Sequence, residues 1–230
     1  YPVINLFPVI KFKQPNMKTL FSTILFALIL NFSFAQNAVV KWAKPFLGGG
    51  MELFDNEYYS VAVDGNGNVY TTGYFQGTFD FDPGPGVFNL TSDIENIFIS
   101  KLDVNGNFVW AKQMTGDQPS NSYAIALDAE RNVYLTGNFS GIVDFDPGPG
   151  ISNLSSYSSS LFVCKLNADG GFIWAKHLGE GGGNMYSYTI TLDNKGNIYT
   201  TGRQAGGDFD PGPQEFILNS SGMFISKLNT

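Results

Sequence analysis

The sequence predicts an all-β fold built from a repeated four-stranded unit, and three observations support this prediction. The hexapeptide Asp-Phe-Asp-Pro-Gly-Pro occurs three times, beginning at Asp80, Asp144 and Asp208, which is an even spacing of 64 residues. Short turns rich in Asn and Gly separate apolar runs that are too short to be helices. Gly accounts for 27 of the 230 residues and aromatic residues for 15%, which suits strands joined by many turns.

Each unit contains four predicted strands, and the second unit shows them most clearly. Its four apolar runs are residues 123–128, 133–137, 161–166 and 172–176. Turns of the first unit contain Asn-Gly, at 66–67 and 105–106, and the third unit has the related Asn-Lys-Gly at 194–196. Asn-Gly is a strong hairpin signal because both residues tolerate positive φ. The runs hold about five or six residues and favour Val, Ile, Phe, Tyr and Thr. Each unit is therefore predicted to be two hairpins that form one four-stranded antiparallel sheet.

Such a sheet has two apolar faces, and copies stacked around an axis bury both faces, which predicts a β-propeller. The repeated Trp-Ala-Lys is expected on the outermost strand, where Trp110 and Trp174 wedge between neighbouring blades. One outer strand at Val39–Lys44 precedes the units, within a partial propeller over residues 36–230. The repeat units are expected at about residues 45–112, 113–176 and 177–230. About three blades do not close a ring, which typically needs roughly four to eight, so the chain is interpreted as a fragment.

The N-terminal residues have the pattern of an export signal. Residues 1–16 precede the first Met and are interpreted as upstream or artefactual translation. Residues 17–35 combine Lys18, an apolar run from Leu20 to Leu30, and small residues at Ser33 and Ala35, which predicts a signal peptide cleaved after Ala35. A membrane anchor is the alternative, but it needs about 20 apolar residues. No membrane span is therefore expected after cleavage.

The repeated residues resemble a known family. The pattern Asp-x-x-Gly-Asn-Val/Ile-Tyr-x-Thr-Gly, followed by Phe-Ile-Ser-Lys-Leu-Asp-x-Asn-Gly-Asn-Phe-Val-Trp-Ala-Lys, resembles the SBBP repeat of seven-bladed β-propellers. The resemblance covers about residues 39–230. The Asp-Phe-Asp-Pro-Gly-Pro-Gly insert, with Asn-Leu-Thr-Ser at 89–92, is similar to the version in secreted proteins of Bacteroidetes. The resemblance implies a propeller fold, export and a cell-surface location, but no single activity.

The loops between the second and third strands are the candidate binding surface. In a four-stranded blade they lie on the same ring face as the variable connections 45–58, 113–122 and 177–187, and rigid scaffolds often carry function on such loops. Each loop places two carboxylates two residues apart, which suits Ca²⁺. The candidate calcium ligands are Asp80, Asp82, Asp144, Asp146, Asp208 and Asp210. The structural alternative is a turn capped by Asp, anchored by a buried Phe and stiffened by Pro. Paired catalytic carboxylates are less favoured, because three copies of one motif suggest architecture.

Composition excludes several classes of site. The net charge of −7 argues against nucleic acid as a partner, because phosphates are bound by Lys and Arg. One Cys and one His are too few for a disulfide or a zinc site rich in these residues. Cys164 aligns with Ser100 and Ser226 and is expected to fill a small-residue position on a third strand. His177 is expected to be a surface residue, and no catalytic residue or bound organic cofactor is predicted.

Three functions remain open on the sequence. The first is a secreted or cell-surface binding or scaffold module whose loop face meets a protein or glycan. The second is part of a polysaccharide-active extracellular enzyme, and the third is a structural, calcium-stiffened adhesin spacer. Residues that interrupt the repeat are mostly Gly, Ser and Asn with scattered acids, which favours binding or structure over catalysis.

Overall fold

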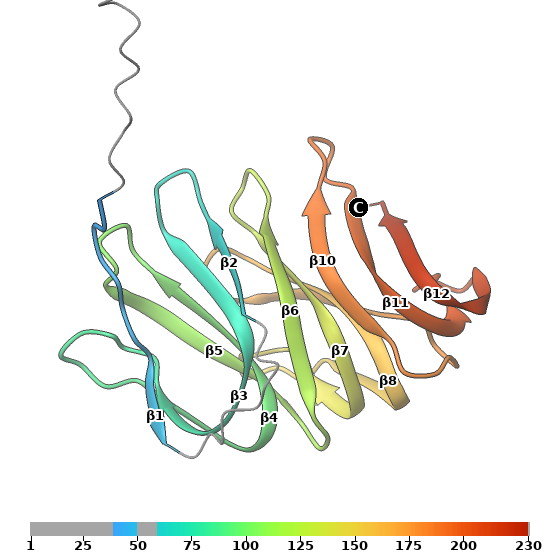
Figure 1. The fold of residues 1–230 in the computed structure, drawn as a ribbon, viewed down its shortest axis with the longest axis horizontal. Coiled ribbons are helices and arrows are strands. Elements are labelled where there is room, and N and C mark those ends of the chain that lie inside the picture. The colour runs from blue at the N-terminus through green and yellow to red at the C-terminus, as the bar shows by residue number, and fades with distance from the viewer. Residues whose placement is uncertain (1–38, 50–58, 230) are drawn as a thin grey trace, which may run out of the picture. The chain divides into compact units, whose positions relative to one another are not determined.

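The computed structural model describes residues 39–49 and 59–229, and every regular element among them is a β-strand (Figure 1). The strands are β1 (Leu47–Gly49), β2 (Ser60–Val63), β3 (Val69–Asp80), β4 (Asn89–Leu102), β5 (Phe108–Gly116), β6 (Ser120–Leu127), β7 (Val133–Asp144), β8 (Asn153–Leu166), β9 (Phe172–Leu178), β10 (Tyr186–Leu192), β11 (Ile198–Asp208) and β12 (Ile217–Leu228). In these described residues no helix has the length and apolar character needed to cross a membrane.

The chain divides into two units, Tyr1–Lys41 and Trp42–Thr230, and the fold described here is that of the second. Only residues 39–41 of the first unit are described. The predicted upstream segment 1–16 and signal peptide 17–35 therefore lie outside the described residues.

Three consecutive antiparallel sheets form the blades that the sequence predicts. The strand orders are β2-β3-β4-β5, β6-β7-β8-β9 and β10-β11-β12, each running from the first strand of a unit to its last. The first strands β2, β6 and β10 lie side by side (Figure 1), and β6 contacts both β2 and β10. The fold is thus all-β, with antiparallel blades of the β-propeller type whose first strands form the inner edge.

The predicted length of the middle strands is wrong. Strands β3 and β4 contain 12 and 14 residues, and β7 and β8 repeat these lengths. The pairing shifts between Phe75 and Gly77, where Asp93, Ile94 and Glu95 of β4 stand opposite a single residue, Gln76. Pairing resumes beyond this bulge and runs to Asp80. The polar residues of the bulge interrupt the apolar pattern, so the sequence showed only the inner half of each long strand.

The first hairpin of each blade closes with the expected turn residues but a different turn type. The Asp64 carbonyl accepts a hydrogen bond from Gly67 N at 2.9 Å, and Asn68 O accepts one from Asp64 N at 3.0 Å. In this turn only Gly67 has positive φ, at 82°, as in a type I turn followed by a glycine bulge. Arg131 occupies the same position in the second blade with φ of 68°. One left-handed residue is therefore enough for this hairpin.

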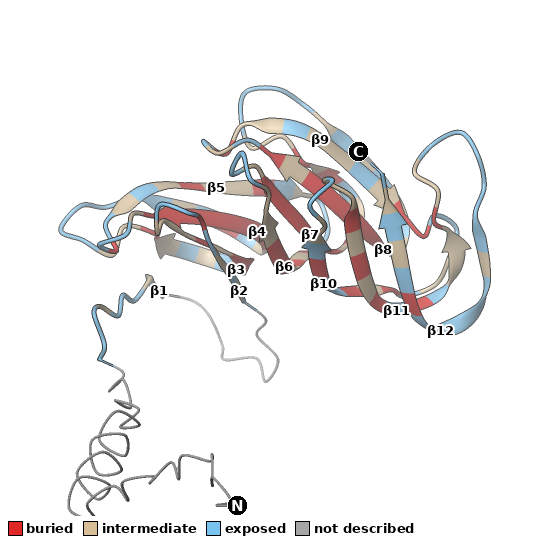
Figure 2. Ribbon diagram, turned by 90° about the horizontal axis from the view of Figure 1, so that it is seen from above, coloured by how far each residue is buried: buried red, intermediate tan, exposed pale blue. Residues whose placement is uncertain are grey.

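The two larger hydrophobic clusters of the described residues lie between blades, and a third, smaller one lies on the first blade. Each blade has a leading face, which carries Phe81, Phe145 or Phe209, and a trailing face, which carries the residue pair Ile97/Ile99, Leu161/Val163 or Met223/Ile225. One buried cluster joins Ile97 and Ile99 of the first blade to the leading face of the second. A second cluster joins Leu161 and Val163 to the leading face of the third. Figure 2 shows buried stretches gathered in the strands between these faces.

The predicted wedging of the Trp residues is confirmed. Trp110 packs on the first inter-blade cluster and Trp174 on the second. A Cβ added to Gly170 would lie 3.2 Å from the Trp110 ring, so the indole packs directly against a turn of the next blade. Gly170 has φ of 76°, a conformation that favours glycine. The indole of one blade and the turn glycine of the next therefore form a repeated contact.

Candidate functional site

The three Asp-Phe-Asp-Pro-Gly-Pro loops connect the second and third strands of each blade. In the first loop, Asp80 Oδ1 accepts hydrogen bonds from Asp82 N at 2.9 Å and Phe88 N at 2.8 Å. Asp82 Oδ1 accepts one from Gly84 N at 2.8 Å. The same bonds recur around Asp144 and Asp208. Phe81 is buried beneath the loop, as are its two counterparts, so each loop is a self-capped turn on an aromatic anchor.

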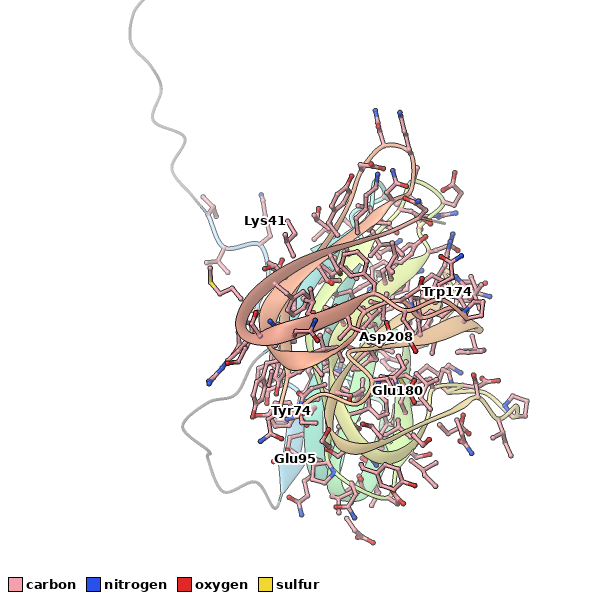
Figure 3. The ribbon with its side chains drawn as sticks, turned by 90° about the vertical axis from the view of Figure 1, so that its right-hand side faces the viewer. Lys41, Tyr74, Glu95, Trp174, Glu180 and Asp208 are labelled. Carbon is pink, nitrogen blue, oxygen red and sulfur yellow. The ribbon has the colours of Figure 1, made fainter. Side chains whose placement is uncertain are left out.

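The connections between blades lie beside these loops, as the sequence predicts for one ring face. β1 pairs with the end of β3, with Leu47 opposite Asp80. The end of β5 pairs with β7, with Thr115 opposite Asp144. Glu180 forms an isolated bridge with Asp208, and Figure 3 shows the two close together. The described connections and loops therefore share one end of the blades, here called the loop end; residues 50–58 of the first connection lie outside the described residues.

The six predicted calcium ligands lie at the loop end in three separate pairs. Among the residues that the structure describes, no three His, Cys, Asp or Glu side chains gather as a metal-binding group. Turn hydrogen bonds engage Oδ1 of each of these carboxylates. A Cβ on Gly86 would lie 2.2 Å from Asp82 Oδ2, so this carboxylate folds back over its own loop. These contacts do not test cation binding, and the calcium site stays a prediction.

A cluster of tyrosines lies at the inner edge of the loop end. Tyr123 and Tyr188 stand at the register shifts of β6 and β10, two inner strands, and their ring centroids are 6.4 Å apart. Tyr186 and Tyr188 are stacked, with centroids 6.2 Å apart and planes at 9°. Tyr59 and Tyr74 of the first blade form a second stacked pair at 6.5 Å. The rings come from all three blades, and together with Glu95 and Asn121 we call them the tyrosine cluster.

Polar groups lie among these rings. Asn121 Nδ2 donates to Glu95 Oε2 at 3.3 Å, which joins the bulge of β4 to the inner strand of the next blade. Burial raises the pKa of Tyr123 well above its ordinary value, and the neighbouring Tyr186, Tyr74 and Glu95 raise it further. The Tyr123 hydroxyl therefore stays protonated near neutral pH. Figure 3 shows Tyr74 and Glu95 close together at this end of the blades.

The cluster combines a repeated residue with residues that differ between blades. Tyr59, Tyr123 and Tyr188 occupy the same position of the repeat. The position of Tyr74 is Asn138 in the second blade and Arg203 in the third, and that of Glu95 is Ser159 in the second. Sequence reasoning missed this site, although a Tyr at the start of each first strand was visible. The missing information was that first strands meet at the inner edge.

The one Cys and the one His of the chain lie on the third and fourth strands of the second blade. The Cys164 thiol is fully buried on β8, in register with Ala175, in the small-residue position that the sequence predicts. Burial raises its pKa, so the thiol is held in its unreactive protonated form. His177 is half-buried, where a surface residue was expected: its ring packs against Phe139 at 5.2 Å, and burial lowers its pKa. The alternation of β9 turns this side chain inward.

Comparison with known proteins supports the interpretation of the sheets as propeller blades. The family model described as a β-propeller repeat, SBBP, matches residues 57–76 and 173–210. An uncharacterized WD repeat-containing protein of Acanthamoeba polyphaga mimivirus is 29% identical over 198 residues. This match covers 75% of the chain but only 14% of the viral protein. The chain is therefore similar to propeller repeats, and the Bacteroidetes assignment stays a prediction.

Proposed function

We propose that this chain is an exported β-propeller repeat module that binds a protein or glycan ligand through its loop end, with the tyrosine cluster as the contact surface. The observation that carries the proposal is the gathering of Tyr74, Tyr123, Tyr186 and Tyr188 from three blades around Glu95 and Asn121. No single blade contains such a surface, so it exists only where the blades are stacked.

The chemistry of the cluster suits recognition. A tyrosine presents a large flat apolar ring and one hydroxyl, so it supplies contact area at a small cost in side-chain entropy. Ser, Asn and Gly supply adaptable hydrogen bonding, and surfaces of this composition bind varied partners. Tyr188 is 50% exposed, which leaves half of its ring for a ligand. The differing residues at the positions of Tyr74 and Glu95 make the surface asymmetric, as selectivity requires.

Export and display at the cell surface belong to the same proposal. They are supported by the signal-like pattern of residues 17–35 and by the frequency of SBBP-type repeats in exported proteins that the resemblance implies. The mass of the chain recovered from the medium of an expressing bacterium shows whether the chain is exported and where it is cleaved. Export predicts a chain that begins at Gln36, and an uncleaved chain retained inside the cell contradicts it.

The binding experiment compares the two ends of the blades. The protein is screened on an oligosaccharide array and against a displayed peptide library, and each binder is titrated by calorimetry. Tyr188→Ala and Glu95→Gln should each weaken binding about tenfold or more. Lys195→Ala, at the exposed turn between β10 and β11 at the opposite end, should leave the Kd unchanged. A binder weakened equally by all three substitutions, or by Lys195→Ala alone, contradicts the assignment to the tyrosine cluster.

A further inference from the structure

The charged side chains are divided unequally between the two ends of the blades. At the end opposite the loop end, Lys165 Nζ lies 3.6 Å from Asp128 Oδ2, which is the one ion pair in the part of the chain that the structure describes. Lys101 lies near this end of β4, and Arg131 and Lys195 lie in its hairpin turns. The opposite end therefore carries both signs of charge.

The loop end is mainly acidic. The six Asp residues of its loops are joined there by Asp93, Glu95, Asp117, Glu180 and Glu215. Of the basic side chains, Arg203 lies at this end, on β11, whereas Lys112 and Lys176 lie on the outermost strands β5 and β9. Within the described residues, none of these loop-end acids forms an ion pair. The loop end therefore attracts positively charged groups.

Glu95 is the acid that belongs to the tyrosine cluster. Its side chain is half-buried, and its Oε2 accepts a hydrogen bond from Asn121 Nδ2 at 3.3 Å. Burial raises the pKa of Tyr123 most, and the charge of Glu95 is among the influences that raise it further, so the two side chains lie close together. A neutral amide leaves the negative charge of Glu95 uncompensated. Because the carboxylate is partly buried, salt screens it less than a carboxylate in open solvent.

The opposite end shows how this fold holds a cation. Lys101 Nζ lies 4.9 Å from the centroid of the Tyr70 ring, and Lys165 Nζ lies 4.8 Å from that of Tyr134. A carboxylate completes the second of these sites, because Asp128 Oδ2 lies near Lys165 Nζ and accepts a hydrogen bond from the Tyr134 hydroxyl at 3.1 Å. A tyrosine ring beside a carboxylate is therefore a combination that binds an ammonium group in this chain.

The tyrosine cluster has the same two components, with more rings. The Tyr186 and Tyr188 rings are nearly parallel, at 9°, and the Tyr123 ring lies next to Tyr188. The face of an aromatic ring is electron-rich and attracts an ammonium or guanidinium group within about 6 Å of its centroid. The described residues contribute no Lys to this cluster. The place that Lys165 fills at the opposite end thus has no counterpart among them.

The centre of this surface lies inside the row of blades. Tyr123 is on β6 of the second blade, which has a blade on each side (Figure 1). Tyr123 and Glu95 are half-buried and Tyr188 is 50% exposed, so a ligand can reach all three. Arg203 lines a hollow of the third blade together with Tyr188, whereas Glu95 belongs to the first blade. A cation is therefore expected on the Glu95 side of Tyr188, over Tyr123.

We propose that the ligand of the tyrosine cluster is a basic segment of a protein, with a Lys or Arg side chain on the faces of Tyr123 and Tyr188 and its charge beside Glu95. This inference rests on the proposed function, because it names the ligand class of the same site. The acidic loop end attracts such a segment and speeds its encounter with the rings. A neutral glycan can stack on the rings but forms no ion pair with Glu95, so it is the less favoured ligand.

The first experiment uses probes that differ only in charge. A peptide of lysines with blocked ends, and the same peptide with every side-chain amine acetylated, are titrated into the full chain by calorimetry. EDTA is present, so that no calcium neutralises the loop carboxylates. The lysine peptide should bind about tenfold more tightly or better, and its Kd should rise with added salt because the contact is between charges. Equal affinities for the two peptides, or tighter binding of the acetylated one, overturn the inference.

Matched variants separate the tyrosine cluster from the general attraction of an acidic protein. Glu95→Gln and Glu130→Gln remove the same charge, the first inside the cluster and the second in an exposed turn at the opposite end. Glu95→Gln should weaken binding of the lysine peptide about tenfold, and Glu130→Gln less than about twofold. Tyr123→Leu should weaken it several-fold, and Tyr123→Phe, which keeps the ring face, should weaken it less. Equal effects of the two Glu substitutions overturn the inference.

The screen of peptides and oligosaccharides distinguishes this inference from the proposed function. Peptides selected on the protein should be enriched in Lys and Arg, and Glu95→Gln should weaken their binding. If oligosaccharides or neutral peptides bind instead, and Tyr188→Ala weakens them while Glu95→Gln does not, the tyrosine cluster remains a binding surface and the basic ligand is overturned. If no peptide and no oligosaccharide binds, the proposed function and this inference are both overturned.

Discussion

The second and third blades share the motifs of the repeat but lie in different surroundings. Leu161 and Val163 of β8 are fully buried, whereas Met223 and Ile225 hold the same positions on β12 and face outward. Both pairs are apolar and both alternate with an inward Phe, Phe162 or Phe224. The repeat therefore specifies a blade with two apolar faces, and the presence of a neighbouring blade decides which face becomes core.

The inner parts of the two blades are alike. Thr136 Oγ1 donates to Phe162 O at 2.7 Å, and Thr201 Oγ1 donates to Phe224 O in the same way. The residues that follow, Gly137 and Gly202, each face a bulge of the first strand of their blade. These contacts form within one sheet, so they do not depend on the neighbour. The comparison separates the hydrogen bonds that form within one blade from the burial that depends on a neighbouring blade.

The largest expected effect comes from the buried member of a matched pair. Leu161→Ala should lower the free energy of unfolding by about 2–5 kcal/mol, because it leaves a cavity in the interface between the second and third blades. Met223→Ala at the same repeat position should change it by less than about 0.5 kcal/mol, because that side chain is 91% exposed. Urea unfolding followed by circular dichroism measures both.

The measurement is made at a concentration at which the chain is monomeric, so that any contact between copies does not contribute. A further control is Ile142→Ala, an exposed position of β7 in the second blade. If Met223→Ala costs as much as Leu161→Ala under these conditions, the trailing face of the third blade is covered within the monomer. That result would remove the difference between the blades.

Local chemistry made some of this structure predictable from the sequence. The repeat, the antiparallel hairpins and the Trp contacts follow from residues near one another in the chain or from the even spacing of the copies. The length of β4 did not follow, because Asp93 and Glu95 break the apolar pattern where the strand bulges. The tyrosine cluster did not follow either, because Tyr74, Tyr123 and Tyr188 meet only once the three blades are stacked.

A second prediction concerns the glycines that face the first-strand bulge. A Cβ on Gly137 would lie 1.9 Å from Asn121 O, and one on Gly202 would lie 1.9 Å from Tyr186 O. Both are backbone contacts inside one sheet. Gly137→Ala and Gly202→Ala should therefore lower the free energy of unfolding by similar amounts, about 1–3 kcal/mol or more. Gly222→Ala on β12 meets nothing within 4 Å and serves as the neutral control. Thermal unfolding of the three variants measures this.

Equal losses at Gly137 and Gly202 would show that the interior of a blade is independent of its neighbours. A much smaller loss at Gly202 would mean that the third blade is loosely formed at its inner edge. In that case the exposure of Met223 would reflect a weakly formed sheet rather than the surroundings of β12.

The smallest expected effect lies in the turns, where the two blades should again behave alike. Hydrogen bonds from Asn197, first of all from its side-chain Nδ2 at 2.7 Å, hold the pKa of Asp193 at about 2, against an ordinary value of 3.8. A lowered folded-state pKa contributes stability above the unfolded pKa, and this contribution is lost as the pH falls from about 4 toward 2. Burial raises the pKa of Asp128 in the second blade, but hydrogen bonds from Asn132 outweigh it, so that this pKa is lowered too.

Asp193→Asn should therefore lower Tm slightly at pH 7 and matter little near pH 2. The Asn keeps one acceptor for the backbone N–H groups of the turn but loses the charge and the second acceptor, Oδ2, to which Asn197 Nδ2 donates. Asp128→Asn should lower Tm somewhat more at pH 7, because Asp128 Oδ2 also lies 3.6 Å from Lys165 Nζ. Melting curves of the wild type and both variants across this range measure the difference. A Tm deficit that persists unchanged at pH 2 would attribute the effect to turn geometry rather than to charge, because protonation should make Asp and Asn nearly equivalent in these turns.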